Sequence, residues 1–121
     1  MPREAYRPED RVKRRSDFHA ARSQGHKAHT PHFLIVVLPR RADGRSSRLG
    51  ITVTKKVSSS AVGRNRVKRV VREVFRRNRE LFPDGCDVFV IAKQGAPELG
   101  YASVLAEVRG AARALARKAA R

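Results

Sequence analysis

The segment from about Ala61 to Arg79 most constrains how this chain of 121 residues can fold. With 100° of rotation per residue, its large apolar side chains fall within one arc of a helix. They are Val67, Val70, Val71, Val74 and Phe75. Such spacing is typical of a helix with one buried stripe, and Ser58 to Ser60 offer N-caps before it. The segment is therefore predicted to be a helix that packs against a core.

The neighbouring arc of this helix is basic. It holds Arg64, Lys68, Arg69, Arg72, Arg76 and Arg79, with Asn65 near its middle. Residues 55–79 contain ten Lys or Arg and one Glu, a net +9 out of the +17 of the whole chain. Cations four residues apart repel one another, so a polyanion would stabilise this helix. A solvated face is the alternative, but a surface that serves only solubility would intersperse the two signs.

Glu73 lies at the edge of the basic arc, where it is expected to pair with Arg69 and Arg77. Asn65 is the one amide among the cations of the arc. An amide can read a base edge or a sugar, whereas Arg and Lys mainly grip phosphates. The arc therefore indicates a surface that binds nucleic acid.

The first half of the chain predicts a short helix and two strands. Ser16 and Asp17 can cap a helix that ends before Gly25, and residues 26–32 are irregular or an edge strand. The apolar run Phe33 to Leu38 favours a strand that is buried on both faces or meets a ligand on one. Leu49 to Thr54 alternate as a half-buried strand, and Asp43-Gly44 predicts an antiparallel hairpin between the two strands.

The second half adds a strand at Val88 to Ala92 and a helix at Tyr101 to Lys118. One side of that helix carries Val104, Leu105, Val108, Ala112 and Leu115. Helices alternating with strands in this order predict a two-layer α/β sandwich with helices against one sheet. We expect a single domain over 1–121, with residues 1–15 as a flexible basic arm.

Composition narrows the cellular setting. Cys86 is the only cysteine, so no internal disulfide can form, and it is expected in the core rather than as a catalytic thiol. No apolar stretch approaches the roughly 20 residues that span a bilayer. The chain is therefore expected to be cytoplasmic, with no membrane partner.

A nuclease active site or a metal site within the protein is not favoured. Metal-dependent hydrolysis needs clustered carboxylates or histidines, and the 11 acidic residues are scattered. Asp84 and Asp87 flank a turn and are expected to be caps or solvated groups. His26, His29 and His32 are three apart in an extended stretch and need not converge on a zinc ion.

Two segments together resemble the bacterial ribonuclease P proteins. Residues 63–72, Gly-Arg-Asn-Arg-Val-Lys-Arg-Val-Val-Arg, are similar to the Arg-Asn-Arg motif of that family, and residues 50–57 to the strand before it. Ser16-Asp17-Phe18 and Phe33 to Val36 resemble the first helix and central strand of the family. The resemblance covers about residues 11–118.

The resemblance implies an α+β fold like ribosomal S5 domain 2, ordered α-β-β-β-α-β-α with a left-handed crossover. It also implies a holoenzyme in which the RNA subunit performs the catalysis with Mg²⁺ and the protein holds no catalytic residue or metal. The partners would be ribonuclease P RNA and precursor tRNA, whose 5′ leader is removed, and no obligate protein partner is expected.

Carried over by position, the resemblance assigns the site residues. The RNA contacts would be Arg64, Asn65, Arg66, Lys68, Arg69, Arg72, Lys55 and Lys56. Phe18, Leu34 and Val36 would face the leader cleft. Arg22 and Val36 stand where many relatives have aromatic residues, so leader stacking is expected to be weaker or replaced by Arg.

Two alternatives share the basic helix. A ribosomal or chaperone-like RNA-binding protein would use the same surface without belonging to an enzyme, and the combined strand and motif argue against it. A membrane-active basic helix is less consistent, because the narrow valine stripe suits a small core.

Overall fold

The computed structural model describes residues 23–39, 47–82 and 85–119, with side chains described to residue 117. Its elements are the strands β1 (His26–His29), β2 (Phe33–Pro39) and β3 (Arg48–Thr52), helix α2 (Ala61–Arg77), strand β4 (Cys86–Ala92) and helix α3 (Tyr101–Ala119). Short 3-10 helices, η2 (Arg79–Leu81) and η3 (Ala96–Glu98), follow α2 and β4. The predicted N-terminal arm, the body of the first helix with Phe18 and Arg22, and the Asp43-Gly44 turn lie outside the described residues.

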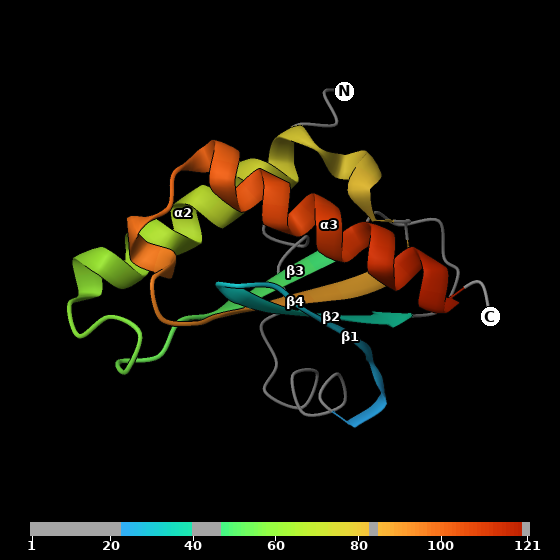
Figure 1. Ribbon diagram of the computed structural model, residues 1–121, viewed down its shortest axis with the longest axis horizontal. Coiled ribbons are helices and arrows are strands. Elements are labelled where there is room, and N and C mark those ends of the chain that lie inside the picture. The colour runs from blue at the N-terminus through green and yellow to red at the C-terminus, as the bar shows by residue number, and fades with distance from the viewer. Residues whose placement is uncertain (1–22, 40–46, 83–84, 120–121) are drawn as a thin grey trace.

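The described residues form two layers, a four-stranded sheet and the helices α2 and α3. The strands lie in the order β1-β2-β4-β3, and Figure 1 shows α2 and α3 together on one face of the sheet. The predicted α+β sandwich is confirmed. The left-handed crossover stays a prediction from the family resemblance.

The strand pairing differs from the predicted hairpin. β2 pairs with β1 and β4, both antiparallel, whereas β3 pairs with β4 in parallel. The hairpin expected between β2 and β3 is therefore wrong, because β4 lies between them. Six of the seven residues of β4 are buried, and a strand this apolar fits a central position, where both faces of the sheet are covered. The edge strand allowed for residues 26–32 is β1.

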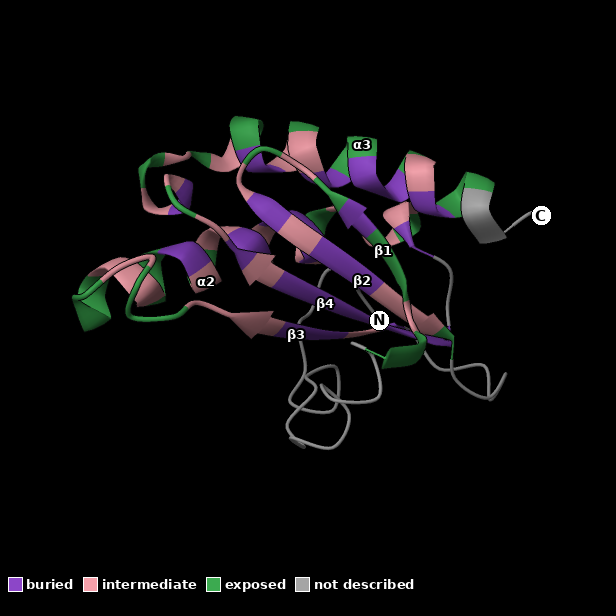
Figure 2. Cartoon of the chain, turned by 60° about the horizontal axis from the view of Figure 1, so that its bottom comes forward, coloured by how far each residue is buried: buried purple, intermediate pink, exposed green. Residues whose placement is uncertain are grey.

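The core fills the space between the sheet and the helices, where Figure 2 shows the buried side of each helix. From α2 it receives Val67, Val71, Val74 and Phe75, and from α3 Val104, Val108, Ala111, Ala112 and Leu115. Val70 and Leu105 pack against it while partly exposed. Both predicted apolar stripes are confirmed, and Cys86 is buried in the same core.

The face of the sheet opposite α2 and α3 carries a second, smaller apolar cluster. Val36 of β2 and Phe89 of β4 are buried at its centre, and Leu34, Leu38 and Ile91 pack around them while partly exposed. The two faces of β2 thus serve two clusters. This explains why its sequence is apolar throughout instead of alternating.

Asp87 is a buried carboxylate on the sheet face opposite α2 and α3, with 2% of its surface exposed. Arg48 Nε donates to Asp87 Oδ1 at 2.8 Å and Arg48 Nη2 to Oδ2 at 2.7 Å. The expectation that Asp87 is a cap or a solvated group is wrong. β4 begins at Cys86, two residues before the predicted start, so Asp87 lies inside the strand and directly opposite Arg48 of β3.

Candidate nucleic-acid interface

The first turn of α2 is fixed by a cap and by bonds to the preceding loop. Gly63 N donates to the Ser60 side chain at 3.0 Å, which confirms the predicted serine cap. The Arg64 guanidinium donates to the carbonyls of Ser58 and Ser59, both at 3.0 Å. No acidic residue lies in this turn, so the positive end of the helix dipole adds to the basic side chains.

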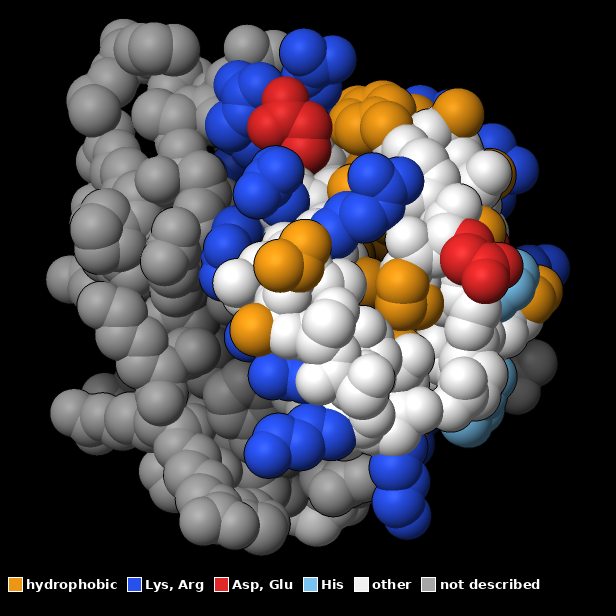
Figure 3. Space-filling model, turned by 90° about the vertical axis from the view of Figure 1, so that its left-hand side faces the viewer, with side chains coloured by type: hydrophobic (Ala, Val, Ile, Leu, Met, Phe, Trp, Pro, Cys, Tyr) orange, Lys and Arg blue, Asp and Glu red, His pale blue; other side chains and the backbone are white. Residues whose placement is uncertain are grey.

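The basic face of α2 is open to solvent. Asn65, Arg66 and Arg69 are exposed, and Lys68 and Arg72 are partly exposed. Figure 3 looks onto the end of the molecule where α2 begins and shows Lys and Arg side chains far outnumbering Asp and Glu. Within the part of the chain that the structure describes, no carboxylate pairs with Lys68, Arg69 or Arg72. These three charges are therefore available to a polyanion.

Glu73 neutralises the other end of the basic face. Its carboxylate pairs with Arg76 and with Arg77, the latter at 2.9 Å. The predicted Arg77 pair is confirmed, while Arg76 takes the place expected for Arg69. The hydrogen bond from Arg76 and the two positive charges hold the pKa of Glu73 below its ordinary value. The available positive charge is thereby concentrated toward the start of α2.

A second connection lies beside the start of α2. Because β3 and β4 are parallel, the connections that follow them leave the sheet at the same edge. Gln94 Nε2, after β4, donates to the carbonyl of Lys56, after β3. Arg66 Nε donates to the carbonyl of Pro97 in η3 at 3.1 Å.

These two bonds position the predicted contacts Lys55, Lys56 and Arg66 as one surface. Both lysines lie in an exposed turn. The contribution of Gln94 was not predicted. No local pattern marks it, since it depends on the parallel pairing of distant strands.

The predicted leader residues Leu34 and Val36 lie side by side on the sheet face opposite α2 and α3. Val36 is 1% exposed and forms the base of the apolar cluster, whereas Leu34 and Ile91 keep exposed surface. Lys27 and His29 pair with Val36 and Leu34 across the β1–β2 ladder, so their side chains point to the same face. Phe89 was not predicted, because the residues around it in β4 are apolar on both faces of the strand.

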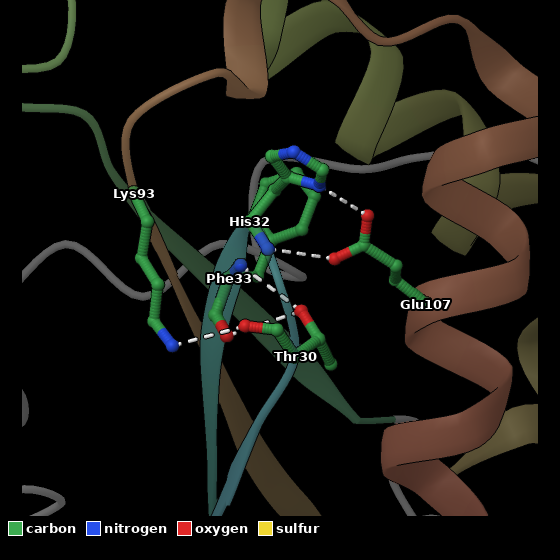
Figure 4. Close-up of polar contacts among 5 residues, drawn as sticks. All are labelled: Thr30, His32, Phe33, Lys93 and Glu107. Carbon is green, nitrogen blue, oxygen red and sulfur yellow. Dashed lines mark hydrogen bonds and ion pairs between the residues drawn. The ribbon is translucent and has the colours of Figure 1, made fainter.

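A cluster at one end of the sheet holds β2, β4 and α3 together (Figure 4). Glu107 of α3 accepts from the backbone N of His32 at 2.9 Å, and its second oxygen lies 2.7 Å from His32 Nδ1. Lys93 donates to the carbonyl of Thr30 at 3.0 Å. Burial works to raise the pKa of Glu107, but hydrogen bonding by Thr30 and His32 outweighs it and holds that pKa below its ordinary value.

The three histidines weighed as zinc ligands do not share a common set of contacts. His32 bonds to Glu107, while His26 and His29 are exposed on β1. Among the described residues, no three His, Cys, Asp or Glu side chains form a group that could hold a metal ion. In the same residues, no helix combines the length and the apolar character that crossing a bilayer requires.

Comparison with known proteins assigns the family. The family model described as Ribonuclease P matches residues 6–116. The ribonuclease P protein component of Desulfovibrio desulfuricans is 44% identical over 109 residues, which are 88% of this chain and 83% of the relative.

Solved structures agree with the sequence match. The Staphylococcus aureus RNase P protein aligns with a TM-score of 0.74 at 28% identity, over 86% of this chain and 93% of that one. The Thermotoga maritima RNase P protein aligns with a TM-score of 0.73 at 31% identity, over 88% and 96%. With its motif helix, its sheet and its sequence all matching, the chain belongs to the family of bacterial ribonuclease P proteins.

Proposed function

We propose that the chain, as the protein subunit of ribonuclease P, uses two faces to bring the catalytic RNA and the leader of precursor tRNA together. The basic face of α2 binds the RNA subunit, and the face of the sheet opposite α2 and α3 binds the leader. The observation that carries the proposal is the exposed, uncompensated basic surface at the start of α2. We place this activity in the cytoplasm, where bacterial tRNA precursors are made.

The contacts on α2 would combine phosphate binding with one more specific contact. Each phosphate that Lys68, Arg69 or Arg72 neutralises releases counterions, so affinity should fall steeply with salt. The Asn65 amide lies among these cations and is suited to a base edge or a sugar. The free amides of the first helical turn are also suited to a phosphate.

The leader would lie across the second apolar cluster. Single-stranded nucleotides pack on apolar and aromatic surface while cations follow their backbone. Leu34, Leu38 and Ile91 offer the half-exposed surface, and Lys27 lies beside them on β1. The metal ions for phosphodiester hydrolysis would be held by the RNA subunit, as in the family.

Reconstitution tests both faces. The full chain is mixed with a bacterial ribonuclease P RNA at low Mg²⁺, and 5′ cleavage of precursor tRNA is measured with and without protein. We expect stimulation by the protein, and tighter holoenzyme binding to precursor than to mature tRNA. Absence of stimulation would overturn the proposal, whereas stimulation with equal affinity for the two tRNAs would overturn only the leader contact.

A further inference from the structure

Helix α3 carries a second row of exposed arginines outside the motif helix. Arg109, Arg113 and Arg117 are exposed and lie four residues apart. Four residues advance a helix by about 6 Å and turn it by only about 40° beyond one revolution. The three guanidiniums therefore form a continuous ladder along one side of α3, with a step comparable to the separation of neighbouring phosphates on a nucleic-acid strand.

The charges of this ladder are not compensated within the described part of the chain. Glu107, the acid nearest to them on α3, faces the sheet and is bonded to His32. No described carboxylate pairs with Arg109, Arg113 or Arg117. Like charges four residues apart destabilise a helix, so a bound polyanion would relieve repulsion here as on α2.

The other exposed residues of α3 have small side chains. They are Ala102, Ser103, Ala106, Gly110 and Ala116. Gly110 lies beside the ladder, about 100° around the helix from Arg109, and a Cβ added to it would meet nothing within 4 Å, so internal packing does not require a glycine. A glycine in a helix is disfavoured by itself, and it permits close approach of another backbone.

A membrane surface fits this face poorly. Membrane-binding helices insert large apolar residues beside their cations, and the only large hydrophobic residue exposed among those described is Val62, on α2. A narrow cationic row beside small residues instead fits the backbone of a nucleic acid.

The position of the ladder favours the RNA subunit over the leader of precursor tRNA as its ligand. α3 lies in the same layer as α2 and on the opposite side of the sheet from the second apolar cluster, and Figure 1 shows the end of α3 far from the start of α2. A ligand on the ladder would thus reach the molecule on its helical side, away from the leader face.

We propose that Arg109, Arg113 and Arg117 form a second contact surface for the sugar-phosphate backbone of ribonuclease P RNA, separate from the segment bound by α2. This inference rests on the proposed function of α2. It assigns the helical layer as a whole to the RNA subunit and the opposite face to the substrate.

Local cleavage from attached probes tests the location. Cys86 is buried, so an added surface cysteine can be labelled selectively with an iron chelate that generates hydroxyl radicals. One holoenzyme carries the probe through Ala106→Cys on α3, and a second through Val62→Cys on α2. Unsubstituted protein treated with the same reagent gives the background.

Both probes should cut ribonuclease P RNA, at different nucleotides, and R109Q/R113Q/R117Q should abolish the cuts from position 106 only. Cuts from position 62 alone would overturn the α3 surface and leave the proposed function standing. Cuts from position 106 that fall only in precursor tRNA would also overturn it. An absence of cuts from both positions would overturn the proposed function of α2 as well.

Affinity measurements separate a local contact from a general effect of charge. The triple glutamine variant should lower the salt slope of RNA binding by about 2, whereas R109K/R113K/R117K should retain it. Gly110→Gln changes no charge and should weaken binding by obstructing the ladder, with Gly110→Ala as its control. An unchanged salt slope in the triple glutamine variant, or equal affinities of the two Gly110 variants, would contradict the proposed contact.

Discussion

At the level of single residues, the division of labour on α2 can be tested by comparing Asn65 with Arg72. Asn65→Ala should weaken binding of ribonuclease P RNA with little change in salt slope, because an amide displaces no counterion. Arg72→Ala should lower the slope by about 1, since one phosphate contact is lost. Fluorescence titrations at several KCl concentrations measure both. If Asn65→Ala left the affinity unchanged, the proposed base or sugar contact would be wrong.

The buried pair of Arg48 and Asp87 gives a second test at this scale. Arg48→Ala leaves the Asp87 carboxylate buried without its bidentate partner, and loss of one member of a buried pair typically costs about 3 kcal/mol. Arg48→Lys keeps the charge and should cost less. Urea unfolding measures the free energy of each variant. A loss below about 1 kcal/mol for Arg48→Ala would mean that water or another group compensates the carboxylate.

Glu107 provides a pH-dependent test. Its pKa lies below the ordinary 4.5 in the folded protein, so its charge stabilises the fold above that pH. This stabilisation is lost as the pH falls through the lower, folded value. Glu107→Gln should cost about 1 kcal/mol at neutral pH, and its difference from the unsubstituted protein should shrink in acid. Chemical unfolding from pH 3 to pH 7 measures this difference, with exposed Glu98→Gln as the control.

At the level of the elements, the helices could be predicted from the sequence but the strand pairing could not. The 3.6-residue spacing of Val67, Val71 and Val74 is a local signal. A helix with this spacing can bury the three side chains only by packing that one side against the core. Pairing depends on segments far apart in the chain. The Asp43-Gly44 turn signal favoured joining the strands that flank it, whereas β4, which follows 34 residues after β3, supplies the apolar faces that both neighbours need.

The start of α2 offers a matched pair of substitutions. Ser60→Ala removes the side chain that accepts from Gly63 N and should lower the free energy of unfolding by about 1 kcal/mol. Ser59→Ala leaves that bond intact and should have little effect, since only its carbonyl is used, by Arg64. Thermal unfolding followed by circular dichroism compares them. Equal losses would show that the cap contributes nothing beyond the loop itself.

At the level of the whole molecule, the net charge of +17 should make stability depend on salt. Repulsion among like charges destabilises a compact state, and salt screens it within about 10 Å at 0.1 M. Raising KCl from 0.05 to 0.5 M should therefore raise Tm by several degrees, about what 1 kcal/mol produces in a domain of this size. Calorimetry measures the shift. A Tm that does not change would indicate that the basic surfaces are already neutralised within the protein.

The candidate interface was predictable only in part. The basic arc of α2 was visible because its residues are close in sequence and share one side of a helix. The alignment of Gln94 and Pro97 beside that arc was not visible, since it follows from β3 and β4 leaving the sheet at the same edge. Phe89 was missed because an all-apolar strand does not show which of its residues face which layer.

Three side chains at the interface donate hydrogen bonds to main-chain oxygens. Gln94 bonds to the carbonyl of Lys56 and Arg66 to that of Pro97. Arg64 bonds to the carbonyls of Ser58 and Ser59. A carbonyl oxygen is present whatever side chain its residue carries. During evolution the residues at the accepting positions can therefore be exchanged, and RNA preference altered, without loss of these hydrogen bonds. The three donor residues are constrained, because their side chains make the bonds. Divergence across this surface should be uneven, and the turn carrying Lys56 is the place where specificity can change at least structural cost.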